Sequence, residues 1–356
     1  MHNYAGATVR TGAPIRWDYV ASAACRLSLG QRTDGLGPGR VQAGEALLVR
    51  VLEPNPAYDN LELASGDTVG LRSGDEFVAV AGSRQALRGF VGGPPESARP
   101  GDRLSILSLG GIVGRFTGGL LDLGVPTAVE VVDRLGQDGQ PLCMAGNAIP
   151  RRAELGPICP VVAVVGTSMS AGKTRAATEL VTSADAAGLR VAAVKLTGVA
   201  CLRDVLRMRE RGAFEAVSFL DAGLASTVDE PELTFIAKGL LHHLNEMGPD
   251  LIVAELGDGI LGPYGVDRLL QDPTLNRAIR VVVLSASDHV GAWGGVELLR
   301  RWGLATDVIT GPVTDSTASS QLLEQTLGVP AVNACTNGHH LFDAIQPRLS
   351  ALKRPL

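Results

Sequence analysis

The feature that most constrains this chain is the glycine-rich segment Gly166–Thr174, which reads Gly-Thr-Ser-Met-Ser-Ala-Gly-Lys-Thr. Five apolar residues before it, Val161–Val165, predict a buried strand, and the pattern after it predicts an amphipathic helix that begins at Lys173. Strand, glycine-rich turn and helix in this order are the context of a phosphate-binding loop, where backbone N–H groups and the helix N-terminus attract an anion. The chain is therefore predicted to bind a phosphate-bearing ligand here.

Several positions of this segment have predicted roles of their own. Lys173 is expected to reach the terminal phosphates, and Thr174 is expected to offer its hydroxyl to Mg²⁺. Gly172 allows the backbone to approach a phosphate without a Cβ atom in the way. The predicted phosphate-binding residues are Gly166, Thr167, Ser168, Ser170, Ala171, Gly172, Lys173 and Thr174. The alternative interpretation is a chance Gly-Lys-Thr within an ordinary loop.

The C-terminal part of the chain, residues 151–356, is predicted to be a P-loop NTPase-like α/β domain. Apolar strands alternate with helical patterns, which predicts a mostly parallel sheet with helices on both faces. The predicted strands are residues 161–165, 191–195, 251–255, 281–284, 308–310 and 331–333. The predicted helices are residues 173–187, 201–211, 232–246, 294–302 and 319–326.

The N-terminal part, residues 1–150, is predicted to be a separate β-rich domain. Its short Val- and Leu-rich runs are punctuated by Gly-Asp and Pro-Gly turns, which favours a small barrel or sandwich over a βαβ unit. These runs are residues 40–53, 60–63, 76–81, 103–109 and 127–133. The proline-rich stretch 148–160 is the predicted linker between the two domains.

The composition excludes several classes of protein. A hydrophobic fraction of 45% and a charged fraction of 19% describe an ordered globular chain. A net charge of −5 gives no basis for non-specific nucleic-acid binding. No apolar run is long enough to span a membrane and the N-terminus lacks a signal-peptide core, so we expect a cytoplasmic protein that binds no membrane. The five scattered cysteines are expected to be free thiols.

Ligands of such α/β folds bind beyond the carboxyl ends of the strands, and two charged residues lie there. Lys195 closes a buried strand, where its charge is costly unless it meets an anion. Glu255 closes another, at a position where P-loop proteins hold Mg²⁺. Lys173, Lys195 and Glu255 are therefore the predicted catalytic residues, with Thr174 and Glu255 as the predicted metal ligands. Alternatively, Lys195 snorkels to the surface and Glu255 caps a helix or forms an ion pair.

Further polar residues near the strand ends are candidates for substrate binding. They are Thr197, Asp221, Asp258, Asp288 and His289. Asp288 and His289 have the chemistry of acid/base groups, although Asp288 equally fits the N-cap of the following helix. An ordinary loop explains Asp221 as well as a substrate contact does.

Gly166–Thr174 resembles the loop of dethiobiotin synthetase and the cobyrinic-acid amide synthases, which share its spacing of five residues between the two glycines. By that resemblance, Lys195 matches the lysine that closes the second strand, and Asp250–Glu255 matches the metal-binding strand. A closer resemblance, over about residues 160–335, is to a P-loop family of unknown function that includes a D-amino-acid N-acetyltransferase encoded beside D-glutamate cyclase. The usual N-terminal half of that family is Rossmann-like, whereas residues 1–155 here are β-rich. The matching segments are Gly166–Thr174, Thr197–Gly198, Phe219–Gly223 and Glu255–Pro263.

Three functions are compatible with these resemblances. In the first, ATP and Mg²⁺ bind at the loop, and a small carboxylate or amine metabolite is activated by phosphoryl transfer or ligation. In the second, the loop holds the phosphates of acetyl-CoA for N-acetyl transfer to an amino acid, with Glu255 or the Asp288–His289 pair as base. The third is a regulatory NTPase. A lysine, a hydroxyl and a carboxylate at converging strand ends favour the first. The resemblance also implies a homodimer that acts on a small molecule.

Overall fold

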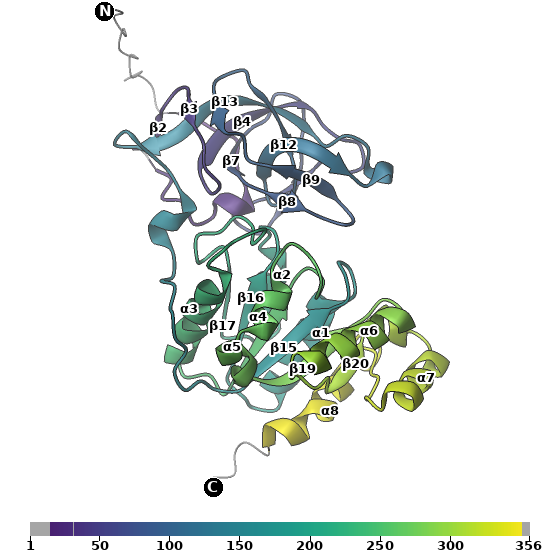
Figure 1. Cartoon of the computed structure of the whole chain (residues 1–356). Coiled ribbons are helices and arrows are strands. Elements are labelled where there is room, and N and C mark those ends of the chain that lie inside the picture. The colour runs from purple at the N-terminus through teal and green to yellow at the C-terminus, as the bar shows by residue number, and fades with distance from the viewer. Residues whose placement is uncertain (1–14, 31, 351–356) are drawn as a thin grey trace, which may run out of the picture. The chain divides into compact units, whose positions relative to one another are not determined.

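The computed structural model describes residues 15–30 and 32–350, and the chain divides into two compact units (Figure 1). The first unit comprises the residues up to Ala148 together with two short segments, Ala200–Leu202 and Gly223–Ala225. The second unit comprises the remainder, from Ile149 onward. The sequence predicted a single boundary after residue 150, and it gave no sign of the two short segments that join the first unit.

The first unit is built around a closed ring of five strands. The ring runs through β4 (Ala46–Glu53), β7 (Glu76–Ala81), β12 (Ile112–Gly119), β11 (Arg103–Ile106) and β13 (Ala128–Gln137), which pairs with β4 again. Only the β7–β12 pair within the ring is parallel. Closure removes the exposed strand edges that an open sheet would leave, so the predicted β-rich domain is a barrel.

The barrel interior is apolar because side chains alternate between its two faces along each strand. Its core includes Leu47, Val49 and Val51 of β4, with Phe77 of β7 and Val131 of β13. The smaller elements of this unit are β1 (Tyr19–Val20), η1 (Ser22–Ala24), β2 (Asp34–Gly35), β3 (Gly39–Arg40), β5 (Asn60–Glu62), β6 (Thr68–Gly70), β8 (Arg84–Gln85), β9 (Phe90–Gly93), β10 (Ser97–Ala98), η2 (Leu121–Leu123), β14 (Gln140–Pro141) and η3 (Met144–Asn147).

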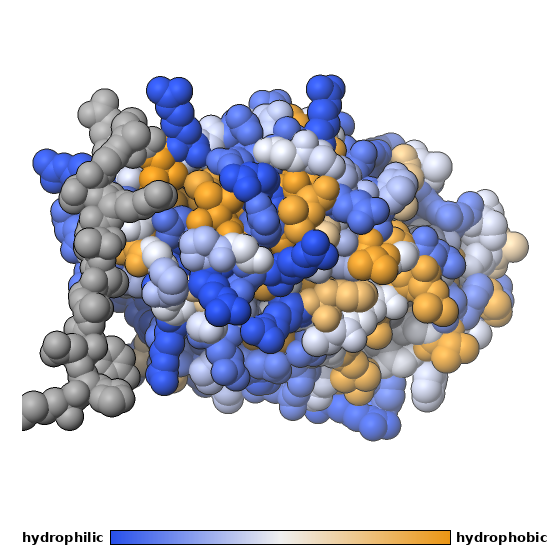
Figure 2. Space-filling model, turned by 90° about the horizontal axis from the view of Figure 1, so that it is seen from above, coloured by the Kyte–Doolittle hydropathy of each residue, from blue (hydrophilic) through white to orange (hydrophobic). Residues whose placement is uncertain are grey.

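Some large apolar side chains of the first unit remain exposed. Leu121 in η2 is 93% exposed, and Val125 just after it and Leu87 are also largely exposed. On the face drawn in Figure 2, apolar residues form several small patches with hydrophilic side chains between them. Dispersed apolar residues of this kind are normal on a protein surface.

The second unit contains a parallel sheet of six strands in the order β17-β16-β18-β15-β19-β20. Every neighbouring pair in it is parallel, which confirms the predicted P-loop NTPase-like α/β class. The strands are β15 (Val161–Gly166), β16 (Val191–Thr197), β17 (Glu215–Ser218), β18 (Leu251–Leu256), β19 (Ile279–Ser285) and β20 (Val308–Thr310).

One strand of this sheet was missed and one predicted strand was wrong. The short β17 was not predicted, because four residues that begin with a glutamate carry little strand signal of their own. Residues 331–333 were predicted as a strand but form only a single bridge, between Ala331 and Ile309. The Asn333 side chain instead accepts hydrogen bonds from the N–H groups of Cys335 and Thr336, which turns the chain away from the sheet.

Helices cover both faces of this sheet. One face of the central strands presents Ala163 of β15 and Ala254 of β18 to a small apolar cavity, which is also lined by Leu241, Leu269 and Leu275 from three helices. Since side chains alternate along a strand, Glu255 points to the opposite face, where α1 packs. The helices are α1 (Lys173–Ala186), α2 (Arg203–Glu210), α3 (Leu233–Glu246), α4 (Val266–Gln271), α5 (Pro273–Ala278), α6 (His289–Arg301), α7 (Thr317–Leu327) and α8 (Gly338–Ser350), with the short η4 (Pro312–Thr314).

Within residues 15–30 and 32–350, none of the helices combines the length and the apolarity that crossing a bilayer requires.

A buried ion pair joins two helices on the apolar-cavity face. Lys238 of α3 donates to Asp272, which caps α5, at 2.8 Å. We expect Lys238→Met to lower the free energy of unfolding by about 3 kcal/mol at pH 7, because it leaves a largely buried carboxylate without its cation. Urea unfolding measures this loss, with the exposed Arg277→Met as the matched control.

The same pair predicts a pH dependence. Burial alone would raise the pKa of Asp272, but the Lys238 ammonium and the backbone N–H groups of Leu275 and Thr274 outweigh burial and lower it. Ionised Asp272 therefore stabilises the fold fully above about pH 4, its ordinary range, and this stabilisation is lost as the pH falls through the lowered value. The difference between wild type and Lys238→Met should shrink in acid, and a constant difference down to about pH 2 would contradict the assignment.

Candidate functional site

The glycine-rich segment forms a loop between β15 and α1, as a phosphate-binding loop requires. Ser170 and Gly172 both have positive φ angles, 62° and 97°, and these reverse the chain so that α1 starts at Lys173. The first N–H groups of a helix have no partner within it, so the start of α1 faces the loop with free donors and partial positive charge. This arrangement suits an anion with several oxygens.

Neighbouring strand ends hold the start of the loop in place. The Thr167 N–H donates to the Ser285 carbonyl at 2.9 Å, and the Gly166 carbonyl accepts from the Ile260 N–H at 2.8 Å. The Ser168 hydroxyl lies 3.1 Å from the Ser287 hydroxyl. The loop is therefore anchored to the segments that follow β18 and β19, while Ala171 within it is fully buried.

Lys173 folds back over the loop. Its ammonium group donates to the Ser168 carbonyl at 2.8 Å, and the side chain is largely buried. Burial lowers the pKa of Lys173, while the nearby Glu255 and Asp258 carboxylates act in the opposite direction. A buried ammonium bonded to a carbonyl is poised to exchange this neutral partner for an anionic one, because charge-assisted hydrogen bonds are stronger.

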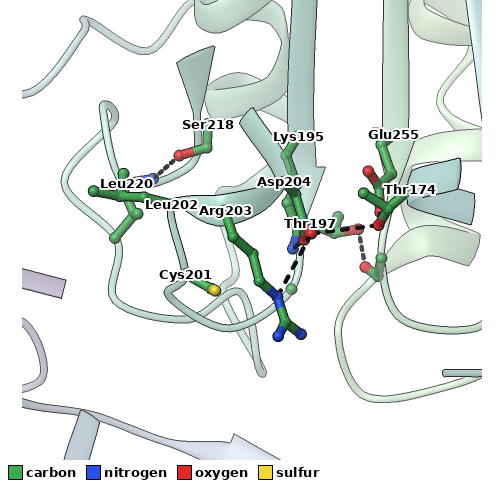
Figure 3. Close-up of polar contacts among 12 residues, drawn as sticks. Thr174, Lys195, Thr197, Cys201, Leu202, Arg203, Asp204, Ser218, Leu220 and Glu255 are labelled. Atoms are coloured by element: carbon green, nitrogen blue, oxygen red, sulfur yellow. Dashed lines mark hydrogen bonds and ion pairs between the residues drawn. The ribbon is translucent and has the colours of Figure 1, made fainter. Parts of the chain in front are cut away.

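Two carboxylates meet the hydroxyl of Thr174. This hydroxyl lies 2.9 Å from Glu255 Oε1 and 3.4 Å from Asp204 Oδ1 (Figure 3). Glu255 is only 2% exposed, and its second oxygen, Oε2, is buried without a hydrogen-bond partner among the described residues. An unsatisfied buried carboxylate oxygen is costly, which makes it a natural ligand for a cation.

Lys195 lies beside this group and forms an ion pair with Asp204. The register of the sheet places Lys195 of β16 directly opposite Glu255 of β18, so both side chains lie on the α1 face. Lys195 is only 8% exposed, which excludes the alternative that it snorkels to the surface. The site therefore gathers two lysines, two carboxylates and one hydroxyl in a buried space.

The two carboxylates respond to this environment in opposite ways. Burial raises the pKa of Glu255, and the neighbouring negative charge of Asp204 raises it further. Burial also opposes ionisation of Asp204, but the Lys195 ammonium outweighs burial and lowers the pKa of Asp204. Asp204 is thus the fixed negative charge of the site, whereas Glu255 has a high affinity for a proton or a cation.

Asp204 was not among the sequence-predicted site residues. The stretch that contains it, Arg203–Arg211, has the composition of a solvated helix face, and three of its arginines belong to α2. The signal was the buried face of that short helix, formed by Asp204, Val205 and Met208. A carboxylate on the apolar side of an amphipathic helix is a candidate site residue.

The predicted substrate residues separate into two groups. Thr197 and Asp258 lie at the site: the Thr197 hydroxyl donates to the Gly257 carbonyl, and the Asp258 carboxylate is close enough to Lys173 to act on its pKa. Gly257 and Asp258 directly follow β18, so these two residues line the same edge of the sheet as Glu255.

The other three predicted substrate residues have structural partners. The Asp221 carboxylate accepts from the Ser218 N–H at 2.8 Å and so shapes the turn after β17. Asp288 is the N-cap of α6 and accepts from the Gly291 N–H, which fits the capping alternative. His289 lies 3.0 Å from the Ser319 hydroxyl at the start of α7.

The donor set fits a magnesium ion. Mg²⁺ prefers oxygen ligands, keeps several waters and is usually held by one or two carboxylates together with substrate phosphates. The Thr174 hydroxyl, the unpartnered Oε2 of Glu255 and the Asp204 carboxylate supply such oxygens. Within residues 15–30 and 32–350, no three His, Cys, Asp or Glu side chains gather to hold a metal by themselves.

Comparison with known proteins finds only solved structures of low sequence identity. No family model and no curated protein matches the chain. Similar solved structures include a DUF1611 family protein from Anabaena variabilis, which is 16% identical in sequence and has a TM-score of 0.40. The matched region covers 56% of this chain and 63% of that protein's chain. Another is chloroplast FtsY from Physcomitrella patens, which is 16% identical in sequence and has a TM-score of 0.38. The matched region covers 59% of this chain and 71% of the FtsY chain.

A third is the signal recognition particle 54 kDa protein from Aeropyrum pernix in complex with GDP, which is 16% identical in sequence and has a TM-score of 0.37. The matched region covers 59% of this chain and 53% of that protein's chain. The chain thus spans less than two thirds of the DUF1611 family protein that it resembles. Identity this low does not transfer an activity, and any activity of this chain must follow from the residues of its site.

The Lys195–Asp204 pair predicts a non-additive effect on stability. Asp204→Leu should lower the free energy of unfolding by about 3 kcal/mol, because it leaves the Lys195 charge buried without its carboxylate. The double variant Lys195→Met/Asp204→Leu replaces both charges by apolar groups and should lose less than either single variant. Urea unfolding of the four proteins measures this coupling, and additive losses would contradict a direct pair.

Proposed function

We propose that the second unit is a P-loop enzyme that binds a magnesium nucleoside triphosphate and transfers its terminal phosphoryl group to a small carboxylate or amine substrate. The observation that carries this proposal is the Thr174–Glu255 contact, with the buried Glu255 Oε2 left unpartnered beside it. A loop that only grips the phosphates of a large cofactor has no need of a metal-binding carboxylate.

Each residue of the site has a distinct task in this reaction. Backbone N–H groups of the loop and the start of α1 hold the phosphate chain. Lys173 would exchange the Ser168 carbonyl for a terminal phosphate oxygen, and Lys195 would add positive charge to the site. Thr174, Glu255 and Asp204 would hold the metal, and a bound metal would neutralise charge on the phosphates.

The chemistry is a displacement at phosphorus. An oxygen or nitrogen of the acceptor attacks the γ-phosphorus, the bond to the β–γ bridging oxygen breaks, and a nucleoside diphosphate leaves with the electron pair. The two lysines stabilise the charge that shifts to the phosphate oxygens during this step. The acceptor class comes from the resemblance to dethiobiotin synthetase, and Thr197 and Asp258 are the candidate residues for contacting it, because they lie on the same edge of the sheet as Glu255.

The first test is ligand-induced thermal stabilisation. ATP, GTP and ADP, each with and without Mg²⁺, and acetyl-CoA are added to the wild type, to Lys173→Ala and to the control Arg175→Ala, whose side chain lies on the surface of α1. A ligand at a hundred times its dissociation constant stabilises the fold by about 2.7 kcal/mol. We expect a magnesium-dependent shift with a nucleotide for the wild type and the control, and none for Lys173→Ala.

Other outcomes of the ligand screen distinguish the proposed phosphoryl transfer from acyl transfer and from a regulatory NTPase. Stabilisation by acetyl-CoA without Mg²⁺, and not by nucleotides, would overturn the proposal in favour of acyl transfer. Nucleotide binding with slow turnover that responds only to a protein partner would favour a regulatory NTPase. Phosphate release that requires a small carboxylate or amine would support the proposed transfer.

A second prediction concerns the metal alone. Glu255→Gln keeps the shape of the side chain but removes the charge that attracts the cation, so Mg²⁺ should no longer tighten nucleotide binding. We expect the dissociation constant in Mg²⁺ to rise at least about tenfold, toward the value of the wild type in EDTA. Titration calorimetry measures both constants. An unchanged magnesium effect in Glu255→Gln would remove Glu255 from the metal site.

A further inference from the structure

The loop between β16 and α2 is divided between the two units. Val199 belongs to the second unit, Ala200–Leu202 to the first, and Arg203 to the second again. Asp204, which contacts Lys195 and Thr174, lies two residues after this segment. A contact that fixes Ala200–Leu202 therefore also fixes the start of α2 and the position of Asp204.

A buried carboxylate of the first unit holds this segment. Glu62 ends β5 and is only 2% exposed. Its Oε2 accepts a hydrogen bond from the Leu202 N–H at 2.7 Å, and its Oε1 accepts from the Cys201 thiol at 3.1 Å. Both oxygens of the carboxylate thus bind the segment, and Oε2 binds Leu202, the residue immediately before α2.

Backbone contacts within the first unit hold Glu62 and the segment in place. The Glu62 N–H donates to the Leu109 carbonyl at 2.8 Å, and β5 pairs with β6. The Ala200 N–H donates to the Ala225 carbonyl at 2.9 Å. A Cβ atom at Gly110 would lie 2.1 Å from the Ala200 carbonyl oxygen, so only glycine permits this close approach.

The geometry points to Glu62 as a positioning residue for the nucleotide site, an inference that rests on the proposed function. The carboxylate satisfies an N–H group next to the first turn of α2 and places negative charge at the end of the helix where it is favourable. α2 in turn fixes Asp204 next to Thr174 and Lys195. Glu62 therefore tunes the magnesium site without touching the metal or the nucleotide, as outer residues of metal sites do.

Hydrogen exchange tests the structural half of this inference without any nucleotide. In Glu62→Ala the α2 amides, residues 203–210, should exchange at least about tenfold faster, because a charge-assisted hydrogen bond at the helix start is lost. Amides of α1 should be unchanged. Glu62→Gln keeps one acceptor oxygen for Leu202 and should restore most of the protection. Asn60→Ala, on the exposed side of β5, is the matched control. Equal α2 exchange in the wild type and Glu62→Ala would overturn the inference.

Nucleotide affinity tests the functional half. With Mg²⁺, the dissociation constant for ATP in Glu62→Ala should rise by about 10- to 100-fold, and with EDTA it should stay within about twofold of the wild type. Glu62→Gln should lie close to the wild type in both. An equal loss with and without Mg²⁺ would show a general structural role and overturn the inference. If the wild type binds no nucleotide, the proposed function fails, and the exchange experiment still decides whether Glu62 holds α2.

Discussion

The register between β16 and β18 is the constraint on which the rest of the site depends. It sets Lys195 directly opposite Glu255 near the carboxyl ends of two buried strands. Opposite charges on adjacent strands cannot be buried in this way unless other groups complete their solvation. Asp204 does so for Lys195 and the Thr174 hydroxyl does so for one oxygen of Glu255, so the remaining oxygen of Glu255 is a position where a cation is still favourable.

Two charged groups of the site lack an oppositely charged partner in direct contact among the described residues, and a ligand would supply one to each. Lys173 rests on a carbonyl, and Glu255 has one satisfied oxygen and one unsatisfied oxygen. A ligand that carries both negative oxygens and a divalent cation supplies the missing partner to each of them at once. A simple anion would satisfy the lysine but would leave the carboxylate as costly as before.

Residue patterns alone predicted the parts of this protein in which local sequence and tertiary position agree. Gly166–Thr174, β15 and α1 follow from glycine placement and hydrophobic periodicity. The barrel was predicted only as a barrel or sandwich, because closure depends on the parallel β7–β12 pair between strands far apart in the chain. Asp204 was missed for a similar reason: the arginines around it resemble those of a solvent-exposed helix, and only the packing of α2 shows which side is buried.

The short segments Ala200–Leu202 and Gly223–Ala225 have a consequence for how such a protein can be divided. A cut of the polypeptide near residue 148 would separate most of the barrel from the sheet, but both segments would stay with the sheet. The barrel expressed alone would lack Leu202 and Cys201, so the Glu62 carboxylate would lose these two donors. A single junction therefore does not divide the polypeptide into the two units, because the first unit also needs two segments from the later part of the sequence.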